Sequence, residues 1–176
     1  MCIRDSCQTE GYANFGDPNN DNWVRRQIAE WACGGNTAAS ERIAADDANI
    51  VVLGWGESPT TDSDIIIGTR GKDVIAARAG DDTVCGRQGD DVIEGGNGLD
   101  ILIGGAGDDI LKGGESTDIL VGGSGKDTLR GGKGADTLRG GKGADTLHGD
   151  TGSDALHGDT GNDKCFTGET IRTCEN

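Results

Sequence analysis

The sequence predicts an all-β chain that is mostly a parallel two-sheet β-solenoid, with a small α/β module at its amino terminus. Two observations predict this fold class. The amino-acid sequence repeats every nine residues from position 59 to position 166, as in GGKGADTLR (131–139) followed by GGKGADTLH (140–148). The 176 residues also include 33 glycines but only 3% aromatics, too few large side chains for a broad core. Short repeats with a thin core indicate coils stacked on one another.

The amino-terminal module is expected over residues 7–58, which hold all three tryptophans. Within it, residues 21–33 place Val24, Ile28 and Trp31 on one face, and the pattern ends at glycine, which predicts one amphipathic helix. The apolar run at 50–53 predicts a buried strand. Residues 7–58 therefore read as a separate unit in front of the repeats.

Twelve nonapeptides cover residues 59–166. Position six is Asp in all twelve, and position eight is aliphatic in eleven and Cys165 in the last. The glycine-rich half of each repeat suits a turn, and the half that reads DTL or DIL suits an extended strand. Side chains alternate along a strand, so position eight is predicted to face inward and positions seven and nine outward.

Two nonapeptides are expected to form one coil, with consecutive repeats on opposite sheets, because one nonapeptide cannot bury its own apolar residue. The position-six carboxylates then form two rows. One row contains Asp64, Asp82, Asp100, Asp118, Asp136 and Asp154, and the other contains Asp73, Asp91, Asp109, Asp127, Asp145 and Asp163. Stacked at about 5 Å, neighbouring carboxylates repel by roughly 1–3 kcal/mol. A cation is therefore expected between them.

Calcium is the cation that these residues favour. Glycine turns offer peptide carbonyls beside each Asp, and Ca²⁺ accepts many oxygen ligands in flexible geometry. Magnesium demands a tighter octahedron, and zinc prefers His or Cys, which these positions lack. The twelve carboxylates are the candidate ligands, for roughly eight to ten ions.

The repeats GGAGDDILK, GGSGKDTLR and GGKGADTLR resemble the RTX, or haemolysin-type, calcium-binding nonapeptide. The resemblance implies a parallel β-roll with calcium held between turns by the position-six Asp and peptide oxygens. It also implies a secreted, extracellular bacterial protein that folds where calcium is plentiful. The expected role is a stabilising, folding or adhesive module.

Several repeats depart from this pattern. The first repeat lacks the glycines around Asp64, Ser116 replaces the fourth glycine before Asp118, and residues 77–85 (ARAGDDTVC) lack both leading glycines before Asp82. Weaker sites are expected there. Asp150 and Asp159 replace the second glycine, where an Asp either adopts the left-handed conformation or adds a ligand oxygen.

The cysteines predict disulfides of an oxidising compartment. Cys165 and Cys174 bracket the carboxy-terminal tail, residues 167–176, and are expected to clasp it, with Cys7–Cys33 as a second pair. Cys85 then has only Cys2 left and is expected to be a free thiol. His148 and His157 fall at outward position nine of successive repeats, so they are expected to be surface residues on opposite sheets rather than a metal pair.

An outward apolar patch is expected at position seven, from Val74, Val92 and Ile110 on one sheet and Ile101 and Ile119 on the other. Such a patch would receive the amino-terminal module or a partner chain. The later threonines at this position suggest a metal-free or ice-binding solenoid as a further alternative.

The net charge of −15, from 31 acidic and 16 basic residues, repels nucleic acid and anionic membranes. No run approaches the roughly 18 apolar residues of a membrane span. No catalytic motif is evident, and GWGES (54–58) is not a GxSxG elbow, so a non-enzyme is expected. Residues 1–6, MCIRDS, resemble a translated sequencing adapter and are expected to be an artefact. The alternative is therefore the carboxy-terminal fragment of a secreted hydrolase, a protease or lipase, whose catalytic domain lies upstream.

Overall fold

The computed structural model describes residues 49–52, 58–167, 170–172 and 174. The helix predicted over 21–33 and most of the predicted module over 7–58 lie outside these residues. The described residues form strands and turns but no helix. None of their elements is a helix long and apolar enough to cross a membrane.

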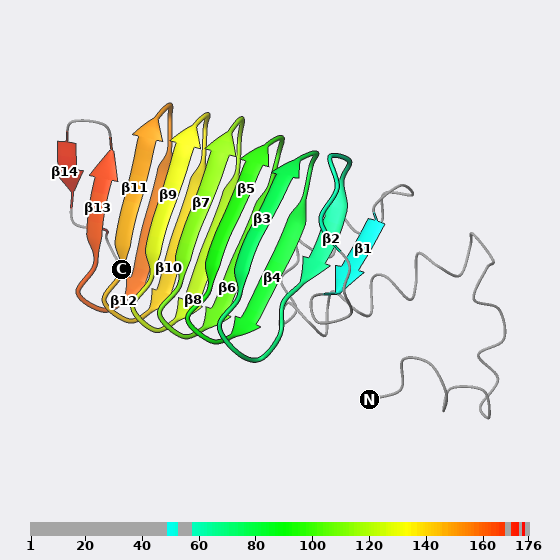
Figure 1. Cartoon of the computed structure of the whole chain (residues 1–176). Helices are drawn as coiled ribbons and strands as arrows, with labels where there is room; N and C mark the ends of the chain where they lie inside the picture. Colours follow the sequence, from blue (N-terminus) through cyan, green and yellow to red (C-terminus); the bar gives the residue numbers. More distant parts are fainter. Residues whose placement is uncertain (1–48, 53–57, 168–169, 173, 175–176) are drawn as a thin grey trace, which may run out of the picture.

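The strands form two sheets that face one another along the solenoid axis (Figure 1). Sheet A contains β1 (Asn49–Val52), β2 (Asp64–Ile67), β4 (Thr83–Gln88), β6 (Ile101–Ala106), β8 (Ile119–Ser124), β10 (Thr137–Lys142) and β12 (Ala155–Thr160). Sheet B contains β3 (Val74–Ala79), β5 (Val92–Asn97), β7 (Ile110–Glu115), β9 (Thr128–Lys133), β11 (Thr146–Thr151), β13 (Lys164–Thr167) and β14 (Thr170–Arg172). Successive repeats alternate between the sheets, as the sequence predicts.

From β2 to β13, neighbouring strands within a sheet pair in parallel with a register of eighteen residues. Leu102 lies opposite Leu120, and Leu120 opposite Leu138. This register stacks each sequence position on the same position of the next coil. The predicted two-sheet parallel solenoid is therefore confirmed.

The core is one column of side chains from each sheet. It consists mainly of the position-eight residues, which are 0–3% exposed: Ile66, Ile75, Val84, Ile93, Leu102, Leu111, Leu120, Leu129, Leu138, Leu147 and Cys165. Because only one apolar side chain per repeat points inward, the core is narrow. The turns at its edges therefore have to be stabilised by something other than apolar packing.

The outer faces of the two sheets differ. On sheet B, Val74 is 77% exposed and Ile110 is 46% exposed, as expected for outward position seven. On sheet A, Ile101 also occupies position seven but is only 1% exposed. Position seven is therefore exposed at Val74 and Ile110 on sheet B, whereas Ile101 on sheet A is buried.

The carboxy-terminal end is closed by an antiparallel pair. β14 turns back on β13, and the predicted disulfide between Cys165 and Cys174 is confirmed, with the two Cα atoms 5.4 Å apart. Cys174 packs against the last core positions. Cys85 is also disulfide-bonded, so the prediction of a free thiol there is wrong. The predicted strand at 50–53 corresponds to β1.

Candidate metal sites

Each position-six Asp lies in a tight turn at the start of a strand. In ten of the twelve, from Asp64 to Asp145, the backbone N–H donates to the Oδ1 atom of the Asp eighteen residues later, at 2.7–3.0 Å. The bond repeats from coil to coil and forms the two predicted rows of carboxylates. One row lies along the edge of each sheet.

The interior members of both rows are buried. Nine of these carboxylates are 0–1% exposed: Asp64, Asp82, Asp91, Asp100, Asp109, Asp118, Asp127, Asp136 and Asp145. Oδ1 is used by the row itself, but the second oxygen, Oδ2, is not. Among the described residues, no hydrogen-bond donor reaches Oδ2 of Asp91, Asp109, Asp127, Asp136, Asp145 or Asp163. A buried anionic oxygen without a donor is costly, so these atoms require a cation.

The space beside each Oδ2 is shaped by the glycine at position one. A Cβ built on Gly140 would lie 2.5 Å from Asp145 Oδ2 and 2.9 Å from the carbonyl oxygen of Gly158, one coil further on. A carboxylate oxygen and a peptide oxygen thus converge where only glycine leaves room. We call this arrangement of a position-one glycine, an Asp Oδ2 and a carbonyl of the next coil a cradle. Eight position-one glycines form a cradle, but in the cradle of Gly68 the Oδ2 atom of Asp73 already accepts the N–H of Thr69. The other seven, which we call complete, are at Gly86, Gly95, Gly104, Gly113, Gly122, Gly131 and Gly140.

The cradle oxygens suit a hard cation. A carboxylate and peptide carbonyls are the ligand types that Ca²⁺ prefers. Among the described residues, no group of three or more His, Cys, Asp or Glu side chains comes together. A cation in a cradle would therefore depend on peptide oxygens beside one carboxylate from each repeat.

Burial raises the pKa values of these carboxyls. Loss of solvation is the largest cause for Asp109, whose pKa rises to about 6, and for Asp127, whose pKa rises to about 7. The N–H donated by the preceding Asp opposes the rise, and the charges of neighbouring carboxylates in the same row add to it. The pKa values of Asp91, Asp136 and Asp145 are raised for the same leading reason. The rows therefore favour a positive charge beside them, either a proton or a metal ion.

The first repeat on each edge differs from the interior ones. Asp64 Oδ2 accepts the backbone N–H of Thr60 at 2.6 Å and lies 3.1 Å from its hydroxyl. Asp73 Oδ2 is held in the same way by Thr69, at 2.7 and 3.1 Å. Threonine at position two thus supplies the donors that the interior carboxylates lack. Sequence analysis noticed the missing glycines before Asp64 but missed the role of these two threonines.

Two repeats that lack a glycine differ in their effect on the cradles: Ser116 preserves the turn before Asp118, whereas Ala77 changes the cradle of Asp82. Ser116 adopts the left-handed conformation with φ of 81°, so Asp118 remains in a turn of the same shape. Ala77 is fully buried and belongs to the core. Its methyl group occupies the inward position that glycine leaves open elsewhere, which restricts the cradle of Asp82.

Asp150 and Asp159 resolve the alternatives left open at position two. Both adopt φ of 66°, and their carboxylates form ion pairs with Arg130 and Arg139 of the preceding coil. They therefore stabilise the outer surface and point away from the cradles.

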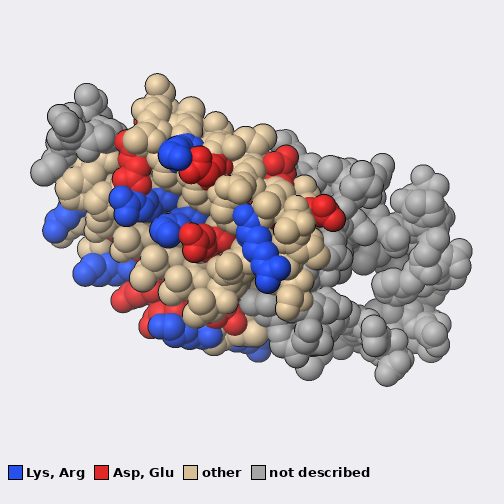
Figure 2. Space-filling model, turned by 45° about the horizontal axis from the view of Figure 1, so that its top comes forward, with Lys and Arg blue, Asp and Glu red and all other residues tan. Residues whose placement is uncertain are grey.

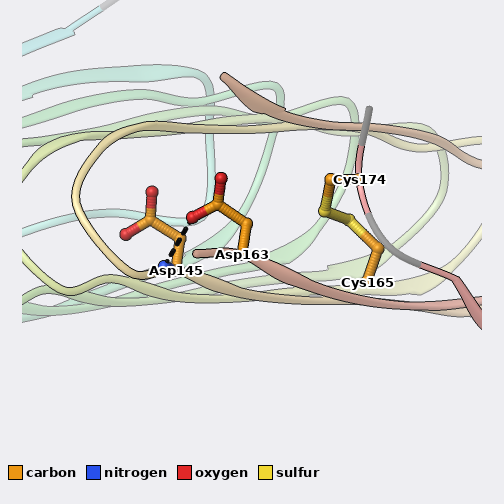
Figure 3. Close-up of a disulfide and its surroundings, with 4 residues drawn as sticks. All are labelled: Asp145, Asp163, Cys165 and Cys174. Atoms are coloured by element: carbon orange, nitrogen blue, oxygen red, sulfur yellow. Dashed lines mark hydrogen bonds between the residues drawn. A yellow bond between two sulfur atoms is a disulfide. The ribbon is translucent and has the colours of Figure 1, made fainter. Parts of the chain in front are cut away.

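The last turn ends beside the disulfide (Figure 3). Asp163 Oδ1 accepts the N–H of Asp145 at 2.9 Å, and Asp163 lies close to the bridge between Cys165 and Cys174. A Cβ on Gly158 would meet Cys174 Cβ at 2.7 Å, where a further coil would otherwise supply a carbonyl. The disulfide thus occupies the end of the row.

Basic and acidic side chains are intermixed on the face shown in Figure 2, with pairs such as Lys112–Glu94 and Lys133–Glu115. His148 lies on sheet B and stacks on Phe166 with 4.5 Å between ring centres, and His157 is exposed on sheet A. The two histidines therefore lie on opposite sheets, as predicted.

Comparison with known proteins agrees with this geometry. The family model described as RTX calcium-binding nonapeptide repeat (4 copies) matches residues 59–93, 94–129 and 130–165. A comparison with curated proteins found no match. The matched segments span more than half of the chain. The roll formed by such repeats is a non-catalytic module. The chain therefore belongs to the RTX calcium-binding repeat family, and it is a calcium-binding repeat protein that forms a parallel β-roll.

Proposed function

We propose that this chain is a secreted module whose β-roll folds when calcium occupies the cradles between coils. In the folded state it serves as a rigid stabilising or adhesive element. The observation that carries the proposal is the set of buried Oδ2 atoms that face a peptide carbonyl and, among the described residues, have no hydrogen-bond donor. Calcium is the ion that satisfies both oxygens at once.

The energetics favour folding coupled to metal binding. Without a cation, the interior turns bury carboxylates that repel their neighbours in the row, and the pKa values of five of them are raised: Asp91, Asp109, Asp127, Asp136 and Asp145. A site with a dissociation constant near 0.1 mM contributes about 1.4 kcal/mol at about 1 mM calcium. Several such sites together supply about as much as the whole stability of a typical domain.

The twelve position-six aspartates are not equivalent in this proposal. Asp64 and Asp73 already accept hydrogen bonds from threonine. Beside Asp154 and Asp163, no carbonyl of the described residues is among the atoms nearest to the position-one glycine. Ala77 restricts the cradle of Asp82. The seven complete cradles therefore set the expected number of strong sites, slightly below the roughly eight to ten ions predicted from sequence.

An extracellular location is supported by two independent features. Millimolar calcium occurs outside cells, where sites of modest affinity are filled. The disulfides at Cys165–Cys174 and at Cys85 form and persist in an oxidising compartment. Both features favour a protein that meets calcium after export.

The test is a calcium titration of the full chain from chelator to millimolar concentration. Far-UV circular dichroism follows folding, and native mass spectrometry counts bound ions, with magnesium as the control cation. We expect β-structure to appear cooperatively with calcium and about seven ions to remain bound. A chain that is equally compact in excess chelator would instead be a metal-free solenoid, and the proposal would fail.

A further inference from the structure

The outer surface of sheet A is unusually apolar over its first coils. We define face A as the side chains at positions seven and nine of β2, β4, β6 and β8: Ile65, Ile67, Thr83, Cys85, Ile101, Ile103, Ile119 and Val121. All but Thr83 are apolar, and the register places them side by side across the four strands. The corresponding positions of sheet B include Glu94, Lys112 and Arg130. Apolar surface of this extent marks a contact site.

Most of face A is also buried, although Ile119 and Val121 are only partly so. Ile65 and Ile101 are 2% and 1% exposed and Ile103 is 8% exposed, whereas Ile110 on sheet B is 46% exposed. Outward side chains of a parallel sheet touch mainly their neighbours on the same face. Such contacts leave their outer surface open, so another part of the chain has to cover face A.

The pairing of the cysteines indicates which part of the chain covers face A. Cys85 lies within face A, between Ile67 and Ile103 of the adjacent strands, and it is disulfide-bonded. Cys165 and Cys174 are bonded to each other. The remaining cysteines of the six are at positions 2, 7 and 33, all on the amino-terminal side of β1. β1 itself pairs with β2 at the edge of sheet A, so the preceding chain arrives beside this face.

We propose that residues 7–48 pack on face A and are tethered to it by a disulfide between Cys85 and Cys7 or Cys33. This bond would replace the Cys7–Cys33 pair expected from the sequence, and Cys2 is left out because residues 1–6 are expected to be an artefact. The β-roll then acts as a platform that holds the amino-terminal segment. Since face A forms only when the coils stack, attachment of the segment would depend on calcium; this last step rests on the proposed function, whereas the disulfide does not.

The first test maps disulfides in the unmodified full chain by non-reducing proteolysis and mass spectrometry. We expect the peptide that contains Cys85 to be linked to a peptide from the amino-terminal segment. A thiol at Cys85, or a link from Cys85 to a second copy of the chain, would overturn the proposal. This measurement needs no variant and no calcium, so its failure is distinct from failure of calcium-coupled folding.

The second test uses a matched pair of variants, Ile101→Lys on face A and Ile110→Lys on sheet B. Both replace isoleucine at position seven, in neighbouring repeats on opposite sheets. Two of the three tryptophans, Trp23 and Trp31, lie within residues 7–48, and none lies in the repeats, so tryptophan emission and acrylamide quenching report mainly on the segment. Circular dichroism reports separately on the roll.

In millimolar calcium we expect Ile101→Lys to increase quenching by at least about twofold and to shift emission to the red. Ile110→Lys should leave both unchanged, and both variants should keep the β-signal of the roll. Equal quenching in the two variants, whether low or high, would show that face A does not hold the segment.

Discussion

Replacing Asp127 by Asn should weaken the response of the protein to calcium while stabilising its metal-free fold. Asp127 is 0% exposed, and its pKa is raised from 3.8 to about 7. Asparagine keeps an oxygen to accept the N–H of Asp109. It also removes the buried charge and places an amide nitrogen where Oδ2 faced the carbonyl of Gly140.

The expected changes in folding free energy follow from the raised pKa of Asp127 and from the calcium affinity of one site. A pKa raised this far corresponds to at most about 4 kcal/mol, and we expect about 1–2 kcal/mol after solvent screening. The metal-free fold of the variant should gain that amount. The additional stability obtained on going from chelator to about 1 mM calcium should fall by about 1.4 kcal/mol, the contribution of one site.

The assay compares folding free energies in chelator and in calcium. Trimethylamine N-oxide drives folding of the metal-free chain, urea unfolds the calcium-bound chain, and circular dichroism reads both. Asp64→Asn is the matched control, because Thr60 already donates to that carboxylate, and it should leave the calcium increment within about 0.5 kcal/mol of the parent. The reasoning is refuted if Asp127→Asn destabilises the metal-free chain or retains the full calcium increment.

Three further outcomes are expected. In chelator, lowering the pH from about 8 to about 5 should stabilise the metal-free roll, because the pKa of Asp127 in the folded state lies above its ordinary value. The stability gained by protonating Asp127 is lost as the pH rises through about 7. A trimethylamine N-oxide midpoint that rises on acidification would contradict this. Replacing Cys165 and Cys174 by serine should lower the free energy of unfolding in calcium by about 2–3 kcal/mol, and a loss below about 1 kcal/mol in urea titrations would show that the clasp is not stabilising. Gly107→Ala should lower the free energy of unfolding by more than about 2 kcal/mol. Gly107 has φ of 135°, and a Cβ there would clash with the carbonyl oxygen of Gly89 in the preceding coil. The control Gly71→Ala, where the nearest atom is 4.0 Å away, should stay within about 1 kcal/mol in the same urea titrations.

Much of the fold could be predicted from the sequence because the repeat is short and strict. A nine-residue period with one inward aliphatic position leaves few ways to bury that position, and alternation between two sheets is the simplest. The two rows of Asp follow directly from the eighteen-residue coil. The Cys165–Cys174 clasp was predictable because the two residues bracket a short tail.

The amino-acid sequence by itself determined the period, the inward column and the identity of the carboxylates, since each depends only on spacing along the chain. The tertiary structure decided what surrounds each carboxylate, because those neighbours come from the next coil. It shows that Thr60 and Thr69 satisfy the first two Asp residues and that Ala77 restricts one cradle. It also shows that Cys85 lies in a buried apolar face. The contacts of Thr60 and Thr69 span four residues within one turn. The contacts between coils join residues eighteen positions apart, and they exist only after the coils have stacked.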